Sequence, residues 1–252
     1  MSQKRLGSVM TWTFVVLMLA LAVTCAWLGT WQLHRLADKE ALIAAVDSRL
    51  GSDPIAAPAA ALWPTLDTEQ LNFQPVSLTG AFRYNQTVTV FTSLADARGQ
   101  ASGPGYWVVT PFVLAEGGTV FVNRGFVPQA FQEAAVTDAE GDENQVTITG
   151  LLRPGEKAGF MTPGPNTSDR IEWVRDPDRL AALVDPALAP FAPFYVDLPA
   201  GAPGELPQGG ETVVEFPNNH LGYAYTWFGF AIVAVVMLGY WLWRQRQGYK
   251  AS

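Results

Sequence analysis

Few side chains in this sequence can hold a metal or act as a nucleophile. The 252 residues contain two histidines, His34 and His220, one cysteine, Cys25, and five scattered methionines. A copper carrier would need clustered Cys, Met or His, and a Ser-His-Asp site would have to use a histidine that borders a long apolar run. Neither a Gly-rich phosphate loop nor a G-x-S-x-G motif is present. The sequence therefore predicts a protein that is not an enzyme.

His220 stands in the stretch FPNNHLGYAYTW, where a Pro/Gly-rich loop gives way to an apolar run. On a helix that begins here, with one of the two preceding asparagines as N-cap, His220, Tyr223 and Trp227 share one face. A histidine flanked by aromatic rings at an apolar edge suits an axial ligand of haem iron. The alternative is an interfacial histidine that hydrogen-bonds to lipid headgroups.

A second aromatic and polar group closes the first apolar run. Trp31 lies one helical turn after another tryptophan, and Gln32, His34 and Arg35 follow directly. Because indole rings favour the headgroup region, an interfacial anchor explains the tryptophans alone. His34 leaves one apolar run and His220 enters the other, so both should lie at similar depth. If the two runs pack together, the histidines could approach one another.

These two groups border the charge-free stretches that decide the protein class. Val9–Leu33 and Leu221–Trp243 are 25 and 23 residues long, and a bilayer core needs roughly 20 apolar residues. The core helix of a soluble protein is rarely that long without a charge. A cleaved signal peptide is the other alternative for the first stretch. However, no A-x-A site follows it, and the apolar run continues past the lipoprotein-like AVTC.

The basic residues predict the orientation. Both tails are basic and lack acidic residues, whereas all 23 Asp and Glu lie between the spans. Since basic flanks stay in the cytoplasm, we expect both termini inside and the middle domain outside. Only three residues precede Lys4, which leaves no room for a transit peptide and favours a bacterial inner membrane with a periplasmic domain. The acidic domain argues against nucleic acid, and the lone cysteine excludes an intrachain disulfide.

The expected class is a membrane protein in which two transmembrane α-helices flank a mostly antiparallel β (α+β) extracytoplasmic domain. The predicted segments are a cytoplasmic tail (1–8), a transmembrane helix (9–33), a periplasmic β-rich domain (34–219), a second transmembrane helix (220–243) and a cytoplasmic tail (244–252).

Within the domain, apolar residues at helical spacing over 36–50 continue the first span out of the membrane. Runs rich in Val, Thr and aromatic residues predict strands at 76–82, 87–93, 106–114, 119–127 and 145–153. A short Gly-bearing turn should join the third and fourth runs as an antiparallel hairpin. We expect a barrel or a sheet covered by helices.

One strand-like run carries a basic residue of interest. Gly125, between Arg124 and Phe126, predicts a positive φ and a bulge or bend in the strand. Arg124 would then contact a partner protein or an anionic ligand group. The alternative is that Arg124 pairs with one of the many carboxylates.

Three motifs, taken in order, resemble the surfeit locus protein 1 family. They are LGTWQLHRLADKEALI, VVTPF with VFVNRGFVP, and NNHLGYAYTWFGFA. The resemblance covers essentially the whole chain. The family's Gly-Trp-Gln-x-x-Arg core is present with Thr30 inserted after Gly29, and its Asn-Arg-Gly-Trp element has Phe126 in the tryptophan position.

The resemblance implies an assembly factor of cytochrome c oxidase that binds haem a transiently and assists its insertion into subunit I. The enzymes that synthesise haem a are further partners on this view. The family's second-span histidine corresponds to His220 and its tryptophan to Trp227. His34 occupies a position that is not fixed in the family, so His220 alone is the implied iron ligand, with His34 as a second candidate.

The predicted site therefore has an iron ligand, ring contacts and an edge. These are His220 as ligand, Tyr223 and Trp227 as ring contacts, Trp31, Gln32 and Arg35 as pocket edge or partner contacts, and Arg124 as a partner or propionate contact. Two alternatives stay open. One is a haem-free scaffold that stabilises an oxidase assembly intermediate, and the other is a periplasmic binding module unrelated to oxidases.

Overall fold

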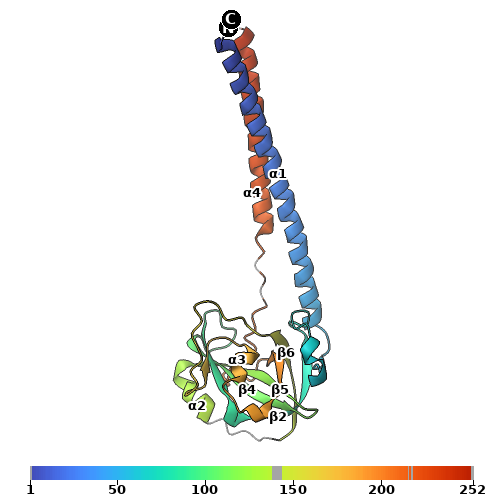
Figure 1. Cartoon of the computed structure of the whole chain (residues 1–252), viewed down its shortest axis with the longest axis vertical. Helices are drawn as coiled ribbons and strands as arrows, with labels where there is room; N and C mark the ends of the chain where they lie inside the picture. The colour runs from blue at the N-terminus through green and yellow to red at the C-terminus, as the bar shows by residue number, and fades with distance from the viewer. Residues whose placement is uncertain (1, 138–143, 215, 217, 251–252) are drawn as a thin grey trace. The chain divides into compact units, whose positions relative to one another are not determined.

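The structure is a computed structural model that describes residues 2–137, 144–214, 216 and 218–250. Figure 1 shows the elements along the chain. The helices are α1 (Ser2–Leu50), α2 (Gln132–Thr137), α3 (Pro177–Ala181) and α4 (His220–Lys250). The strands are β1 (Ile55–Ala56), β2 (Pro75–Phe82), β3 (Val88–Leu94), β4 (Gly103–Leu114), β5 (Thr119–Pro128), β6 (Val146–Pro154), β7 (Ile171–Glu172) and β8 (Phe191–Asp197). Short 3₁₀ turns include η2 (Tyr84–Gln86).

Two long helices carry the apolar stretches. The segments Val9–Leu50 and His220–Gln247 are long and apolar enough to cross a bilayer. Only 11% and 17% of their most apolar windows are buried, so their apolar side chains face outward. A core helix of a soluble protein would be mostly buried. The predicted class, two transmembrane helices that flank an α+β domain, is confirmed.

The chain divides into a helical unit and a folded domain. The helical unit contains α1 up to Ala45 together with α4, and the domain comprises Val46–Val214. The helix predicted to continue past the first span is confirmed, since α1 runs to Leu50. The compact unit of the structure spans Val46–Val214, and the predicted segment bounds of 34–219 stay a prediction. The predicted membrane boundaries and the orientation of the chain stay predictions.

Within the helical unit, α1 and α4 pack antiparallel (Figure 1). The rings of Phe14 and Trp241 lie 4.7 Å apart between centroids at one end. Near the other end, a Cβ atom added to Gly29 would lie 2.8 Å from Phe228 Cε1. Gly29 therefore lets the two helices approach closely, as small residues do in membrane helix pairs.

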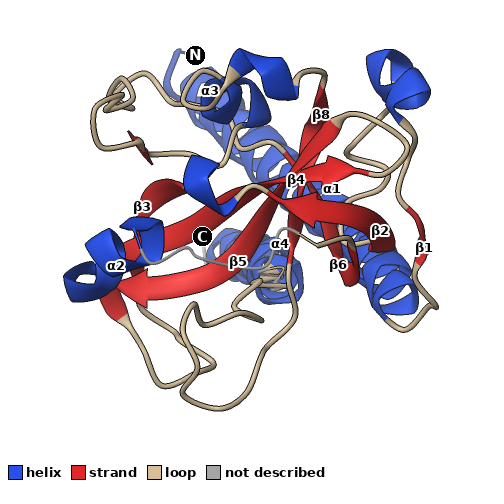
Figure 2. Ribbon diagram, turned by 90° about the horizontal axis from the view of Figure 1, so that it is seen from below, coloured by secondary structure: helices blue, strands red, loops and turns tan. Residues whose placement is uncertain are grey.

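In the domain, five strands form a closed ring (Figure 2). The sheet order is β1-β2-β6-β8-β5-β4-β3-β7, and the additional pairing of β2 with β4 closes the ring. The 12-residue β4 makes this possible, because residues 103–109 pair with β3 and residues 112–114 pair with β2. The barrel-like expectation and the five predicted strands are confirmed.

The β4–β5 hairpin is antiparallel, as predicted. Most other pairings are antiparallel as well, but β5 and β8 pair in parallel, as do the two-residue strands β1 and β7 with their neighbours. Very short edge strands expose few unpaired backbone groups, which limits pairing with other chains.

Alternate residues of β5 and β8 face two separate cores. Val120 and Val122 of β5 belong to a core with Phe112 and Leu152, whereas Phe121 faces the other way. In β8, Phe194 and Val196 share the first core, and Tyr195 joins the second core with Leu180 of α3. Both faces of these strands are therefore buried, and polar residues do not alternate with apolar ones along them.

A buried ionic network lies at the end of β8. Asp197 is 3% exposed. Its carboxylate accepts hydrogen bonds from Asn123 Nδ2 at 2.7 Å and from Thr212 Oγ1 at 2.8 Å. Arg175 approaches Asp197 at 3.6 Å and donates through Nε to Glu156 at 2.9 Å. Burial raises the pKa of the neighbouring Tyr195 hydroxyl.

Replacing Gly29 with leucine should separate the helices around Cys25. This thiol is 2% exposed and lies one turn before Gly29. Forced overpacking of this kind costs about 1–3 kcal/mol. In detergent micelles, N-ethylmaleimide should alkylate Cys25 faster in G29L than in the unmodified chain. Gly239→Leu is the matched control, because a Cβ there has no neighbour within 4 Å. Equal alkylation rates in G29L and G239L would contradict the close packing.

The Glu156–Arg175 pair should contribute stability that depends on pH. Burial alone would raise the pKa of Glu156, but the Arg175 guanidinium outweighs it and holds that pKa below its ordinary 4.5. A carboxyl with a depressed pKa stabilises the fold above pH 4.5, and this stability is lost as the pH falls below that value. Glu156→Gln should therefore lower the melting temperature at pH 7 more than at pH 3. The exposed Glu69→Gln serves as control; an equal loss in E156Q at both pH values would refute the prediction.

Candidate functional site

The contact face of α1 consists of buried residues at alternating spacings of three and four. They are Ala22, Cys25, Gly29 and Gln32. Three of the four are small, which suits a close helix pair, and the fourth is a polar amide that is 9% exposed. Burying an amide without a partner costs about 1–3 kcal/mol. Gln32 therefore needs a polar partner on α4.

That partner is His220, the first residue of α4. The distance between His220 Nδ1 and Gln32 Oε1 is 2.7 Å. Because a carboxamide oxygen only accepts hydrogen bonds, the imidazole nitrogen that faces it carries the proton and donates. In the part of the chain that the structure describes, no hydrogen bond to Nε2 is found. The second ring nitrogen of His220 thus keeps a lone pair that can bind a metal.

Aromatic and basic side chains predicted for the site fall on one side of this helix pair. Counted from the contact face at about 100° per residue, Trp31 and Arg35 of α1 lie to one side. Since the helices run antiparallel, Tyr223 and Trp227 of α4 lie to the same side. We refer to these four residues as the aromatic side. Trp31 is 46% exposed, Tyr223 is 57% exposed and Trp227 is half-buried.

His34 does not join this group. It lies two residues after Gln32, or about 200° further round α1, so it points away from the contact face. It is exposed, and in the described structure no hydrogen bond joins it to His220. The approach of the two histidines stays a prediction. A haem ligand at His34 stays a prediction that this geometry does not favour.

The start of α4 follows the asparagine pattern of the sequence. The Asn219 carbonyl accepts the first helical hydrogen bond, from the Tyr223 amide at 3.3 Å, so Asn219 stands at the N-cap. Asn218 Oδ1 is buried and has no hydrogen-bond partner. Just before α4, the ring of Phe216 is covered by the Lys39 ammonium of α1, which lies 5.1 Å from the ring centroid.

Arg124 occupies the bulge that its glycine neighbour predicts. The β4–β5 register shifts between Val108 and Val109, which leaves Arg124 as the extra residue on β5. Gly125 has φ +137°, and a Cβ there would lie 2.3 Å from the Gln208 carbonyl carbon. Next to it, the Phe126 amide donates to the Gln208 carbonyl at 2.8 Å. The bulge therefore binds the loop that leads back toward α4.

The guanidinium of Arg124 lies over an aromatic ring and not beside a carboxylate. Its Cζ atom is 4.9 Å from the centroid of the Tyr84 ring. In the described part of the chain it forms no ion pair, so the predicted alternative of a carboxylate partner is not observed there. Burial lowers the pKa of Arg124 from its ordinary value. The five N–H donors of this side chain stay available to an anionic group.

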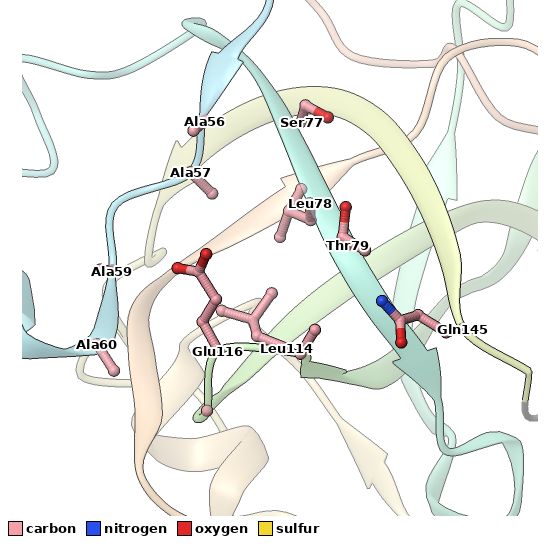
Figure 3. Close-up of a pocket in the computed structure, with 12 residues that line it drawn as sticks. Ala56, Ala57, Ala59, Ala60, Ser77, Leu78, Thr79, Leu114, Glu116 and Gln145 are labelled. Atoms are coloured by element: carbon pink, nitrogen blue, oxygen red, sulfur yellow. The ribbon is translucent and has the colours of Figure 1, made fainter.

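A cavity of about 490 Å³ lies in the domain between β2 and the β4–β5 turn. Figure 3 shows its wall of alanines, with the Glu116 carboxylate and the Gln145 amide at its edge. Among the described residues of the lining, Glu116 is the one ionisable side chain, and none is a histidine or cysteine. More widely, the described residues contain no cluster of three His, Cys, Asp or Glu that could hold a metal. The helix pair is therefore the better candidate for haem iron.

Comparison with known proteins decides the family. The SURF1 family profile matches residues 19–232, which include Gly29, Gln32 and His220 of the helix pair, the ring of strands and Arg124. The chain belongs to the SURF1 family. SURF1 proteins are known as cytochrome c oxidase assembly factors, and the resemblance drawn from the three sequence motifs is confirmed.

Relatives from animals, a choanoflagellate and a bacterium match most of the chain. A SURF1-like protein of Monosiga brevicollis is 32% identical over 93% of this chain and 88% of its own length. Surfeit locus protein 1 of Homo sapiens is 30% identical over 84% of this chain and 72% of its own. A SURF1-like protein of Rickettsia felis is 29% identical over 83% of this chain and 88% of its own length.

The sequence indicated the members of the site but not how they pair. Gln32 was expected at a pocket edge, whereas it is the direct partner of His220. The spacing Ala22, Cys25, Gly29, Gln32 carried the necessary information, because a polar residue that continues a line of small residues faces the partner helix. The contact of Arg124 with Tyr84 joins residues that are 40 positions apart, and no local pattern signals it.

Replacing each of two half-buried arginines, Arg175 and Arg124, with methionine should lower the free energy of unfolding by very different amounts. Removing Arg175 takes the close ion-pair partner from Glu156 and one of two cations from the buried Asp197, which Arg153 still approaches at 3.6 Å. Breaking a buried pair costs up to about 3–5 kcal/mol, so R175M should lose much more stability than R124M. Removing Arg124 strands no carboxylate among the described residues, so R124M should change the unfolding free energy by less than about 1 kcal/mol. Denaturant unfolding of the full chain, followed by near-UV circular dichroism, measures both. A loss in R124M as large as that in R175M would contradict the assignment of Arg124 as unpaired.

Proposed function

We propose that this protein binds haem a at His220 and assists its insertion into subunit I of cytochrome c oxidase. The observation that carries the proposal is the imidazole of His220. Its Nδ1 bonds to Gln32 Oε1 at 2.7 Å, and no hydrogen bond to its Nε2 is found in the described structure. Membership of a family of oxidase assembly factors supplies the context.

The residues present fit a haem group. A neutral imidazole is a common axial ligand of haem iron. Tyr223 and Trp227 can pack against an apolar macrocycle, and Arg35 can meet a propionate. Arg35 is bound only loosely, because its pair with Asp38 spans 3.7 Å and both side chains are exposed. Haem is cargo here: its electron-transfer and oxygen chemistry belongs to the oxidase that receives it.

The same geometry suits release. One histidine at the edge of a helix pair holds iron by a single protein ligand, and the aromatic side is open for a partner to approach. A carrier must bind its cargo weakly enough to hand it on. We therefore expect substoichiometric haem in the purified protein, supplied by the enzymes that synthesise haem a and passed on to subunit I.

We further propose an inner-membrane location, with both termini cytoplasmic and the domain periplasmic. The basic tails and the acidic middle support this orientation. The bacterial relative in Rickettsia felis is consistent with it. In this arrangement the site lies at the periplasmic boundary of the membrane, and Arg124 on the domain is a contact for subunit I or for a propionate.

Haem content tests the proposal. The full chain, co-expressed with haem a synthesis enzymes and purified in detergent, should show a haem a absorption spectrum. His220→Ala should remove most of this absorbance, because the His220 imidazole is the proposed iron ligand and the chain's other histidine, His34, lies away from this side. His34→Ala is the matched control and should keep it.

Three outcomes would count against the proposal. Unchanged haem in H220A would exclude ligation by His220. A haem-free chain that still copurifies with subunit I would indicate a scaffold that stabilises an assembly intermediate. Intact oxidase activity and oxidase haem content after deletion of the gene would exclude any role in oxidase assembly.

A further inference from the structure

The side chain of Gln32 is the hydrogen-bond partner of one ring nitrogen of His220, Nδ1. It is 9% exposed, it lies in a line of small residues, and its one hydrogen bond in the described structure joins Oε1 to His220 Nδ1 at 2.7 Å. The bond links the two helices across 188 positions of sequence. Neither side chain satisfies its polar group within its own helix.

We propose that Gln32 is a positioning residue that fixes the tautomer and the direction of His220. This inference rests on the proposed function of His220 as a haem ligand. The carboxamide oxygen selects the tautomer with the proton on Nδ1, which leaves the lone pair on Nε2. It also fixes the imidazole plane, so Nε2 is presented at the edge of the helix pair.

The physical reason lies in the two forms of a neutral imidazole. One nitrogen is a donor and the other an acceptor, and the hydrogen bond at one nitrogen decides which nitrogen can bind a metal. At an apolar boundary, little water competes for Nδ1, so an acceptor supplied by the protein has a larger effect than it would at a wet surface. Histidines that bind metals commonly donate their other N–H to such an acceptor, and loss of that acceptor typically lowers metal affinity about 10–100-fold.

The Gln32–His220 hydrogen bond also depends on how closely α1 and α4 approach one another. Gln32 lies one turn after Gly29, whose contact with Phe228 sets how closely the helices approach. Ala224, one turn after His220 on α4, is 1% exposed and closes the same contact. Any motion that separates α1 from α4 at this point would break the Gln32–His220 bond and release the imidazole. The ligand is therefore ordered only while the pair is closed.

A purely structural role for Gln32 is the competing explanation. In that case the hydrogen bond would hold the helices together and have no effect on iron. The tautomer of His220 separates the two explanations, since helix packing alone does not dictate which ring nitrogen carries the proton.

The test uses the full chain labelled with ¹⁵N-histidine, in which only two imidazoles give signals. Above about pH 8, where an unperturbed imidazole is neutral, long-range ¹H–¹⁵N spectra should show His220 with its proton on Nδ1. His34, identified by its loss in H34A, is the internal reference. In Gln32→Leu the His220 signals should move to a mixture of tautomers, and in Gln32→Glu, which keeps an acceptor, the Nδ1–H form should persist.

Haem retention is measured on the same variants after co-expression with haem a synthesis enzymes. Q32L should bind haem about 10–100-fold more weakly than the unmodified chain, and Q32E should retain it. Thr30→Leu, an exposed position whose hydroxyl bonds only to its own helix at Trp27, is the matched control. Slow alkylation of Cys25 in Q32L would show that the helix pair stays closed.

The outcomes separate this inference from the proposed function. If H220A loses haem but Q32L keeps both its haem and the Nδ1–H form, Gln32 has no positioning role and the proposed function stands. An Nε2–H form in the unmodified chain would also overturn the inference. Absence of haem from the unmodified chain would overturn the proposed function. It would also overturn the inference that Gln32 positions His220 to bind iron.

Discussion

The hydrogen bond between His220 and Gln32 is the interaction on which the site depends. Two transmembrane helices gain little from apolar contact with one another, because lipid is as apolar as their side chains. Close packing at small residues and a few polar bonds must hold the pair. In this chain both are found within one turn of helix, where Gly29 lets α4 approach and Gln32 meets His220. The same contact that pairs the helices therefore orders the side chain proposed to bind iron.

The strands of the folded domain close into a ring. Ring closure through the long β4 leaves only two-residue strands at the edges of the sheet. Alternation along β5 and β8 fills one core inside the ring and a second core under α3. The buried network around Asp197 then joins β8 to Arg175 and Glu156. Arg124 differs from these buried charges, because its bulge places it over Tyr84 and away from any described carboxylate.

Much of this fold is readable in local sequence, and the rest depends on contacts between distant residues. Runs of Val, Thr and aromatic residues predict strands because these side chains fit a pleated, half-buried surface. The pairing of Gly80 with Leu114, which closes the ring, joins strands that no local pattern connects. For the site, the helical period predicts that His220 and Trp227 share a face of one helix, and α4 does begin at His220. Equal depth alone could not decide whether His34 faces His220, because that depends on which face of α1 meets α4. The buried line that ends at Gln32 marks the face of α1 that meets α4, and the exposed His34 lies outside that line.

The central claim is that Nε2 of His220 binds haem iron. Resonance Raman spectroscopy of the reduced, haem-loaded full chain tests it directly through the iron–nitrogen stretching band. The account predicts that this band shifts when the protein is labelled with ¹⁵N-histidine, that it is unchanged in H34A, and that it is lost in H220A. A band that does not respond to ¹⁵N-histidine, or one that persists in H220A, would contradict the account.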